Sequence, residues 1–294
     1  MTEFVVPVRA FGAGSQPVGD AEPQLLGVPR EMATFSMPSV PERAGREPLR
    51  QARDALARLA AMMEGWDPGA EPCGPRLDLG GLAPEARALA AQMLGEGEVA
   101  IRIDGARPVR IQESVFTGIW QVCAVDGAGT LAVDAVEAAA LPGVVVERAR
   151  AAAEPRLASV DIPAGAMNSP SVLREIGARM RLRRGARAHV VNLTLLPLTP
   201  DDHAVLEAAL PAGPVALMSR GFGNCRITST LARDVWRVQY FNSMSTLILN
   251  TIEVVDVPEV ALAAVEDLAD SRVRLAELVA WMSESCDDEE RGRP

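Results

Sequence analysis

The chain has 294 residues, 48% of them hydrophobic, and a formal net charge of −10. This length allows two domains with their own cores, and the acidic charge argues against a general nucleic-acid-binding protein. All 29 basic residues are arginine, which excludes enzymes that need a Schiff-base lysine or a P-loop lysine.

Residues 1–76 are predicted to form an irregular N-terminal segment with one helix, at 47–64, where Leu56, Leu59 and Met63 share one side. The first residues lack the basic start and the apolar stretch of a secretory signal. No apolar run in the chain reaches the roughly 18–20 residues that a membrane-spanning helix requires. We therefore expect a cytoplasmic protein that does not insert into a membrane.

Residues 77–160 are predicted to form the first of two related modules. A short apolar segment at 77–82 precedes a helix, and strand-like runs rich in apolar and β-branched residues follow. Trp120 and Val122 share one face of a strand and are expected in the core. A second helix is expected to start at Pro142.

Residues 161–189 are predicted to connect the modules through a helix. Ser169 can cap the N-terminus of this helix, and Pro170 suits its first position. The helix ends in a basic run at 179–187. That run is either a solvated face or a contact with an acidic partner or with the acidic end of the chain.

Residues 190–282 are predicted to form a second copy of the first module. A shift of 116 positions places residues 77–144 on 193–260 without a gap, and it places Trp120 on Trp236. Self-similarity at one fixed offset indicates an internal duplication. The two modules should therefore share one strand order and one pattern of inward-facing residues.

The second copy begins with a helix near Pro200, continues with four strand-like runs and ends in a long helix. We predict an α+β fold of two tandem modules, each an antiparallel four-stranded sheet with helices on one face in a two-layer sandwich. Joining the sheets edge to edge would hide exposed strand edges, so joined sheets are favoured over separate ones. The long helix is expected to pack on the second module, and residues 283–294 to form an acidic tail.

The two copies differ most where the second one carries extra polar and aromatic side chains. Tyr240 stands where the first copy has Ala124, and Asn242 stands where it has Asp126. Ordinary turn chemistry and a polar strand face are the alternative to a binding site here. The candidate partner-binding residues of this region and of the connecting helix are Asn168, Ser169, Pro170, Gly221, Phe222, Gly223, Asn224, Cys225, Arg226, Tyr240 and Asn242.

Catalytic residues, metal ligands and cofactors are not predicted. The chain has two histidines and four cysteines, and no CxxC pair groups the thiols. The Gly-x-Gly at 221–223 lacks the third glycine of the dinucleotide fingerprint, and a strand rather than a helix is expected after it.

Several continuous sequence motifs are typical of one family. They are LGEGEV at 94–99, ESVFTGIW at 113–120, MNSP at 167–170 and VWRVQYFNS at 235–243. In these motifs the chain resembles the HupH family of hydrogenase expression proteins, which includes HyaF and HoxQ. The resemblance covers roughly residues 77–282, and it adds little for the N-terminal residues.

The resemblance implies an accessory protein that binds the precursor of the iron–sulfur small subunit of an uptake [NiFe]-hydrogenase before twin-arginine export. It further implies a thioredoxin-like accessory protein as a second partner, and it supplies no catalytic residues. The first hypothesis is therefore a binding chaperone that is not an enzyme. An iron–sulfur or metal carrier using Cys225, and a small-molecule enzyme using Arg226, Tyr240 and Glu253, are the alternatives.

Overall fold

The protein is described by a computed structural model that covers residues 45–70, 74–125, 131–182, 188–221 and 224–290, without the side chains of residues 131–133 and 285–290. The candidate residues Phe222 and Gly223 lie outside the described residues, as does most of the irregular segment predicted at 1–76. No helix within the described ranges has both the length and the hydropathy to cross a bilayer.

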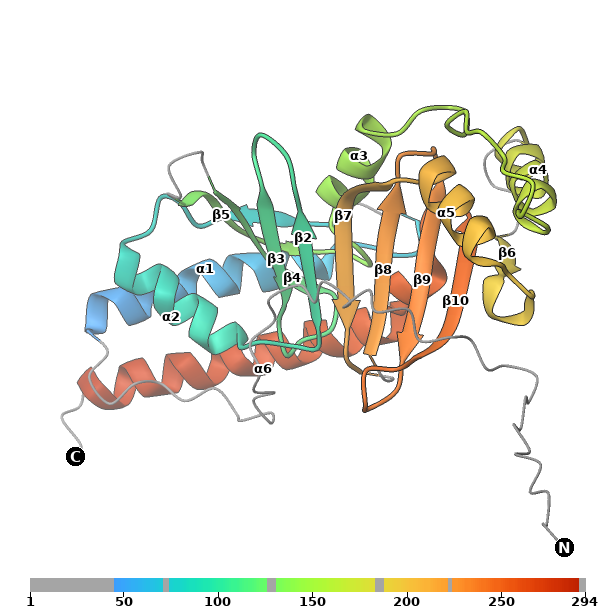
Figure 1. Cartoon of the computed structure of the whole chain (residues 1–294). Coiled ribbons are helices and arrows are strands. Elements are labelled where there is room, and N and C mark those ends of the chain that lie inside the picture. Colours follow the sequence, from blue (N-terminus) through green and yellow to red (C-terminus); the bar gives the residue numbers. More distant parts are fainter. Residues whose placement is uncertain (1–44, 71–73, 126–130, 183–187, 222–223, 291–294) are drawn as a thin grey trace, which may run out of the picture. The chain divides into compact units, whose positions relative to one another are not determined.

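Six α-helices and ten strands make up this part of the chain (Figure 1). The helices are α1 (Arg46–Glu64), α2 (Pro84–Leu94), α3 (Gly143–Ala151), α4 (Ser169–Met180), α5 (Pro200–Ala209) and α6 (Val265–Glu290). The strands are β1 (Arg76–Asp78), β2 (Val99–Ile103), β3 (Val109–Glu113), β4 (Ile119–Val125), β5 (Leu131–Ala138), β6 (His189–Asn192), β7 (Ala212–Ser219), β8 (Asn224–Thr230), β9 (Val235–Phe241) and β10 (Leu247–Val254).

One antiparallel sheet holds all ten strands in the order β1-β5-β4-β3-β2-β7-β8-β9-β10-β6. The prediction of two four-stranded sheets was therefore wrong in its layout, although the α+β class and the edge-to-edge joining are confirmed. Each half has a fifth strand because the short segment that opens each copy pairs with the last strand of its own half, as β1 with β5 and β6 with β10. Those segments are only three or four residues long, too short to show a strand period in sequence.

The joint between the halves has pseudo-two-fold symmetry. Ile101 on β2 pairs with Leu217 on β7, which is its own equivalent under the 116-residue shift. The pairing of Trp120 with Glu137 is likewise repeated by that of Trp236 with Glu253. Because a segment and its own copy lie antiparallel, the contact is isologous and a two-fold axis passes through the middle of the sheet.

One face of the sheet is apolar, and we call it the closed face. Its central row runs straight across six neighbouring strands. Trp120 and Trp236 lie on the same face, and each indole N–H donates to a backbone carbonyl, of Ala139 at 2.8 Å and of Asp256 at 3.3 Å. The row consists of Val122, Ile111, Ile101, Leu217, Ile227 and Val238.

Helix α3 packs on the closed face through Val145 and Ala149, so the expectation of helices on one face alone was also wrong. The opposite face carries helices at both ends: α1, α2 and α6 enclose a core with Ile119 and Val136, while α4 and α5 enclose a core with Ile252. The middle of this second face lies between α2 and α5 (Figure 1), and we call it the open face.

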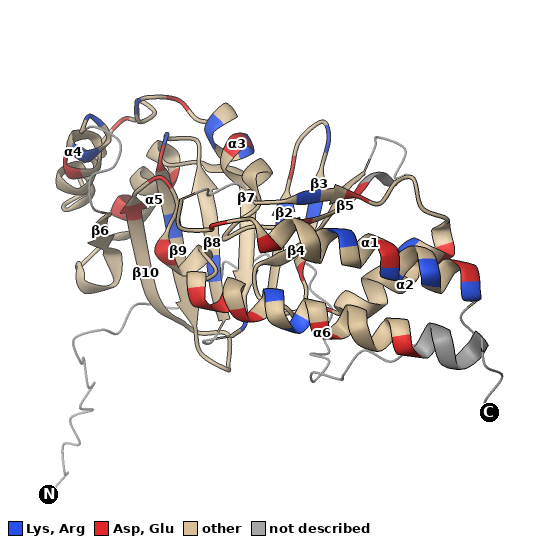
Figure 2. Ribbon diagram, turned by 180° about the vertical axis from the view of Figure 1, so that it is seen from behind, with Lys and Arg blue, Asp and Glu red and all other residues tan. Residues whose placement is uncertain are grey.

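The C-terminal helix α6 returns to the first half of the protein. Its buried residues Leu275 and Met282 belong to the core around α1, and Arg274 lies over the ring of Phe116 at 5.3 Å. The expectation that this helix packs on the second copy was therefore incorrect. Acidic and basic residues are distributed along α6 (Figure 2), and most of those in its first half are exposed. An amphipathic pattern of this kind predicts the helix, but it does not identify the surface on which the helix packs.

Candidate functional site

Two polar rows cross the middle of the open face, on the same strands whose alternate residues form the apolar closed face. Their arginine and glutamine side chains are exposed or half-buried. The direct pairings across the strands define each row. The first row is Cys123, Arg110, Arg102, Ala216, Thr228 and Arg237, and the second is Gln121, Gln112, Ala100, Met218, Arg226 and Gln239.

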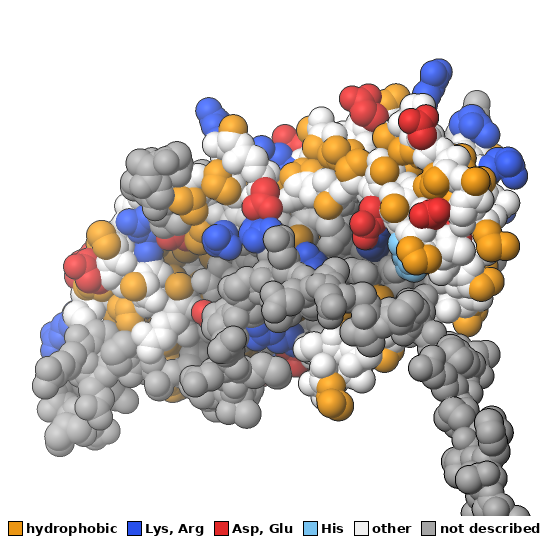
Figure 3. Space-filling view, in the orientation of Figure 1, with side chains coloured by type: hydrophobic (Ala, Val, Ile, Leu, Met, Phe, Trp, Pro, Cys, Tyr) orange, Lys and Arg blue, Asp and Glu red, His pale blue; other side chains and the backbone are white. Residues whose placement is uncertain are grey.

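The duplication explains two of the four arginines. Arg110 and Arg226 are equivalent under the 116-residue shift, so the pseudo-two-fold axis places one in each half of the open face. Arg102 is particular to the first copy, where the second has Met218, and Arg237 is particular to the second. Arginine side chains are visible along the middle of the view in Figure 3.

These guanidinium groups are poorly compensated by the described residues. The Nε atoms of Arg102 and Arg226 are buried without a hydrogen-bond acceptor among the described residues. Burial, and then the charge of Arg102, lower the pKa of Arg226. Arg102 itself forms a 3.1 Å ion pair with Asp104, whose side chain is exposed. Unfilled donors of this kind favour binding of an anionic group.

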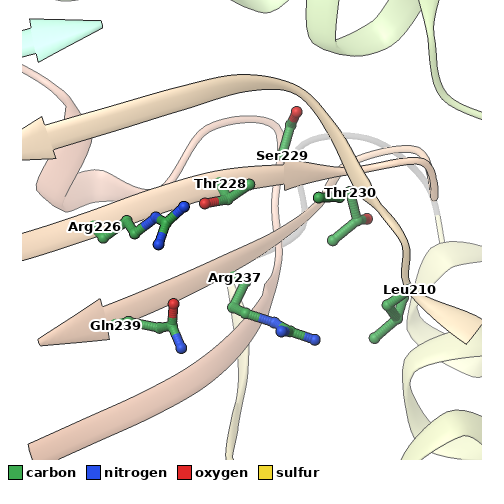
Figure 4. A pocket seen from close by; sticks show the side chains of 8 residues that line it. Leu210, Arg226, Thr228, Ser229, Thr230, Arg237 and Gln239 are labelled. Atoms are coloured by element: carbon green, nitrogen blue, oxygen red, sulfur yellow. The ribbon is translucent and has the colours of Figure 1, made fainter. Parts of the chain in front are cut away.

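A shallow pocket of about 150 Å³ lies at the second-copy end of the open face. Arg226, Thr228, Arg237 and Gln239 line it on one side of β8 and β9, while Ser229 points to the other side (Figure 4). Burial lowers the pKa of Arg237, and the carboxylate of Glu207 acts in the opposite direction. The pocket therefore offers guanidinium, hydroxyl and amide groups to a ligand.

Cys225 and Tyr240 lie on the closed face, away from Arg226. They are paired across β8 and β9 and form a side-chain hydrogen bond. Burial raises the pKa of the Cys225 thiol to about 11, and burial followed by the interaction with Cys225 raises the pKa of Tyr240 to about 12. The residue Cys225 is 3% exposed and belongs to the apolar core, which is typical of a structural cysteine.

Three further candidate residues lie at strand ends and turns. Asn242 accepts hydrogen bonds from the backbone N–H groups of Met244 and Thr246, both at 2.9 Å, and so shapes the β9–β10 turn. Asn224 pairs with Phe241 at the start of β8. Gly221 is exposed and lies beside the Glu98 carboxylate. Partner binding at these positions stays a prediction.

Asn168 and Ser169 hold the start of α4 against α5, and Pro170 lies in the first turn of α4. The buried Asp202 carboxylate accepts hydrogen bonds from the Ser169 hydroxyl at 2.7 Å and from the Asn168 backbone N–H at 3.0 Å. Burial alone would raise the pKa of Asp202, but bonds donated by Ser169, Thr199 and Asn168 outweigh it and hold the pKa well below its usual range. The structure thus gives this segment a structural role, and a binding role stays a prediction.

Sequence reasoning selected Arg226 but missed Arg102, Arg110, Arg237 and Thr228 as members of one surface. The only available signal was alternation within single strands, such as Trp236 facing away from Arg237. Joining these residues into rows requires the register between strands. Within the described residues no group of His, Cys, Asp and Glu side chains could hold a metal ion.

Comparison with known proteins identifies the family. The model for the "HupH hydrogenase expression protein, C-terminal conserved region" matches residues 49–159 and again residues 166–282, once in each half. The hydrogenase expression/formation protein HoxQ of Cupriavidus necator is 43% identical over 284 residues, covering 96% of this chain and 99% of HoxQ. HupH of Rhodobacter capsulatus is 41% identical, covering 95% and 98%.

A solved structure of the hydrogenase expression protein HupH from Thiobacillus denitrificans aligns with 38% of this chain and 95% of its own length, at 31% identity and a TM-score of 0.36. The family model matches both halves of the described sheet and most of its helices. This chain therefore belongs to the HupH family of hydrogenase expression proteins.

Proposed function

We propose that this chain is an accessory protein of hydrogenase maturation that binds the precursor of the iron–sulfur small subunit of an uptake [NiFe]-hydrogenase. Relatives that align over nearly the whole chain are named hydrogenase expression/formation proteins. In this proposal the protein is cytoplasmic and acts before the precursor is exported. A thioredoxin-like accessory protein is its second partner. It assigns the chain no catalytic step and no cofactor.

The observation that carries the proposal is the polar open face between α2 and α5. Arg110 on β3 and Arg237 on β9 are four strand spacings apart, which corresponds to about 19 Å at ~4.8 Å per strand. A surface this broad, lined by arginine and amide donors, suits contact with another polypeptide better than enclosure of a small substrate.

The apolar surroundings of Cys225 do not favour the alternative of an iron–sulfur carrier. A cluster needs several thiolate ligands, and Cys225 is buried on the closed face with a raised pKa. Cys123, in the row of Arg110, faces the other side of the sheet. These two thiols therefore cannot ligate one cluster in this fold.

Anaerobic co-expression tests the proposal. The full chain carrying an affinity tag is co-expressed with the small-subunit precursor, with the hydrogenase large subunit in a parallel culture, and with an established chaperone–client pair as a positive control. The proposal predicts a stoichiometric complex with the small-subunit precursor alone. Absence of that complex while the positive control is recovered would refute it.

A further inference from the structure

The open face has a charge opposite to that of the protein as a whole. The chain carries a net charge of −10, yet four arginines meet on five neighbouring strands: Arg102, Arg110, Arg226 and Arg237. Of these, Arg102 has an exposed carboxylate partner in Asp104 at 3.1 Å. The other residues of the two polar rows are neutral, such as Thr228 and Gln239.

The chemistry of these side chains specifies an anionic ligand with several acceptor oxygens. A guanidinium presents five N–H donors and no acceptor, and the buried Nε atoms of Arg102 and Arg226 have no acceptor among the described residues. A carboxylate bound by an arginine forms two parallel, charge-assisted hydrogen bonds. Binding would therefore satisfy donors that are already partly removed from water.

The spacing of the arginines favours an extended chain over a single small anion. Arg110 and Arg226 stand three strand spacings apart, about 14 Å at ~4.8 Å per strand. A single phosphate or carboxylate group is too small to form hydrogen bonds with both of these guanidinium groups. An extended polypeptide advances about 3.3 Å per residue, and alternate side chains point to the same side. About six residues would cross from Arg110 to Arg237.

We propose that the open face binds an extended acidic segment of a partner polypeptide, whose aspartate or glutamate carboxylates bind Arg110, Arg102, Arg226 and Arg237 in turn. The pocket of about 150 Å³ beside Arg226 and Arg237 receives one of those carboxylate side chains, with Thr228 and Gln239 as further hydrogen-bonding groups. This inference rests on the proposed function, because it names the chemistry by which the client is held.

The direct test is fluorescence anisotropy of the full-length protein with a labelled, acetylated peptide of alternating glutamate and serine, about ten residues long. The control peptide has glutamine in place of glutamate. The expected result is binding of the glutamate peptide alone, weakened as salt is added because the contact is electrostatic. Equal binding of both peptides would overturn the proposal.

Variants locate the contact. Changing Arg226→Gln together with Arg237→Gln removes two guanidiniums from the open face, and is expected to weaken peptide binding at least about tenfold. Arg156→Gln together with Arg272→Gln removes two exposed arginines elsewhere, and is expected to leave peptide binding unchanged. Equal losses in both double variants would contradict the assignment. Circular dichroism melts establish that each variant is folded, and Arg110→Gln provides a second test should one fail.

Competition with inorganic phosphate separates a polypeptide site from a small-anion site. Displacement of the peptide by phosphate beyond the effect of sodium chloride at equal ionic strength would show a small-anion pocket and overturn the inference. Co-purification distinguishes this failure from failure of the proposed function. If the precursor binds and the acidic peptide does not, the inference fails alone; if the peptide binds and the precursor does not, the function fails.

Discussion

The two faces of the central sheet are built from alternate residues of the same strands, yet they are opposite in character. On the closed face, Ile227 and Val238 continue an apolar row that α3 covers. On the open face, their neighbours Arg226 and Arg237 carry guanidinium groups and line the pocket. The comparison teaches that the closed face provides the stability of the duplicated sheet, while the open face is free to carry a binding function.

Breaking the closed face should have the largest effect. Trp236 is 4% exposed and donates its indole N–H to the Asp256 carbonyl at 3.3 Å. Trp236→Ala should lower the free energy of unfolding by about 3–5 kcal/mol, because it removes buried apolar area and leaves a cavity. Urea denaturation followed by circular dichroism measures this change. A loss below about 1 kcal/mol would show that the indole is not part of the core.

Glu113, a buried carboxylate on the closed-face side, should make the stability of the fold depend on pH. Burial raises the pKa of Glu113 to about 7, and the charges of Glu98 and Asp267 add to the shift, although the Gly118 N–H donates to its carboxylate at 3.0 Å. A carboxyl whose folded pKa is raised favours folding below its unfolded pKa, near 4.3, and loses that contribution as pH rises through about 7.

Glu113→Gln should therefore increase stability at pH 8, on the order of 2–3 kcal/mol, and have little effect at pH 4. Chemical denaturation at both pH values measures the difference. The variant Gln112→Glu serves as a comparison, because it places a carboxylate at the neighbouring, half-buried position on the open face. An equal effect of Glu113→Gln at both pH values would contradict the assigned pKa.

Asp202 gives the opposite pH dependence. Its folded pKa lies below its usual range because Ser169, Thr199 and Asn168 donate to it. It therefore stabilises the fold above its unfolded pKa, near 3.9, and loses that contribution as pH falls further. Asp202→Asn should cost about 2 kcal/mol at pH 7. The exposed neighbour Asp201→Asn is the matched control, and equal stability of the two variants would refute the structural role of Asp202.

The open face should contribute least to stability. Arg226→Gln removes a guanidinium whose Nε has no acceptor among the described residues. Its free energy of unfolding should therefore stay within about 0.5 kcal/mol of the parent, or rise, because a half-buried side chain with an unsatisfied donor is lost. The same urea titration used for Trp236→Ala measures both values. A destabilisation above about 2 kcal/mol would show that Arg226 serves the fold instead.

The sequence predicted the parts of the fold that depend on local repetition. The duplication, the inward positions of Trp120 and Trp236 and the joined edges follow from the repeated apolar alternation and from the need to cover strand edges. The fifth strands, the position of α3 and the return of α6 to the first half depend on contacts between distant segments. An amphipathic period does not name the surface that a helix covers.

The candidate site was predictable only in fragments for the same reason. Arg226 appeared as one residue in a polar strand, but its neighbours Arg237 and Thr228 join it through pairing between strands. Ser169 appeared as a capping residue, whereas its hydroxyl bonds to Asp202, which lies in the next helix. Cys225 was a candidate because a thiol can bind a metal or a partner, and only its place on the closed face shows that it is buried.

The most direct test of the account is the amount of small-subunit precursor recovered under anaerobic co-expression. The open-face variant Arg226→Gln/Arg237→Gln is compared with the surface variant Arg156→Gln/Arg272→Gln. The account predicts that recovery falls at least about tenfold for the open-face variant and is unchanged for the surface variant. Equal recovery with both folded variants would contradict the assignment of client binding to the open face.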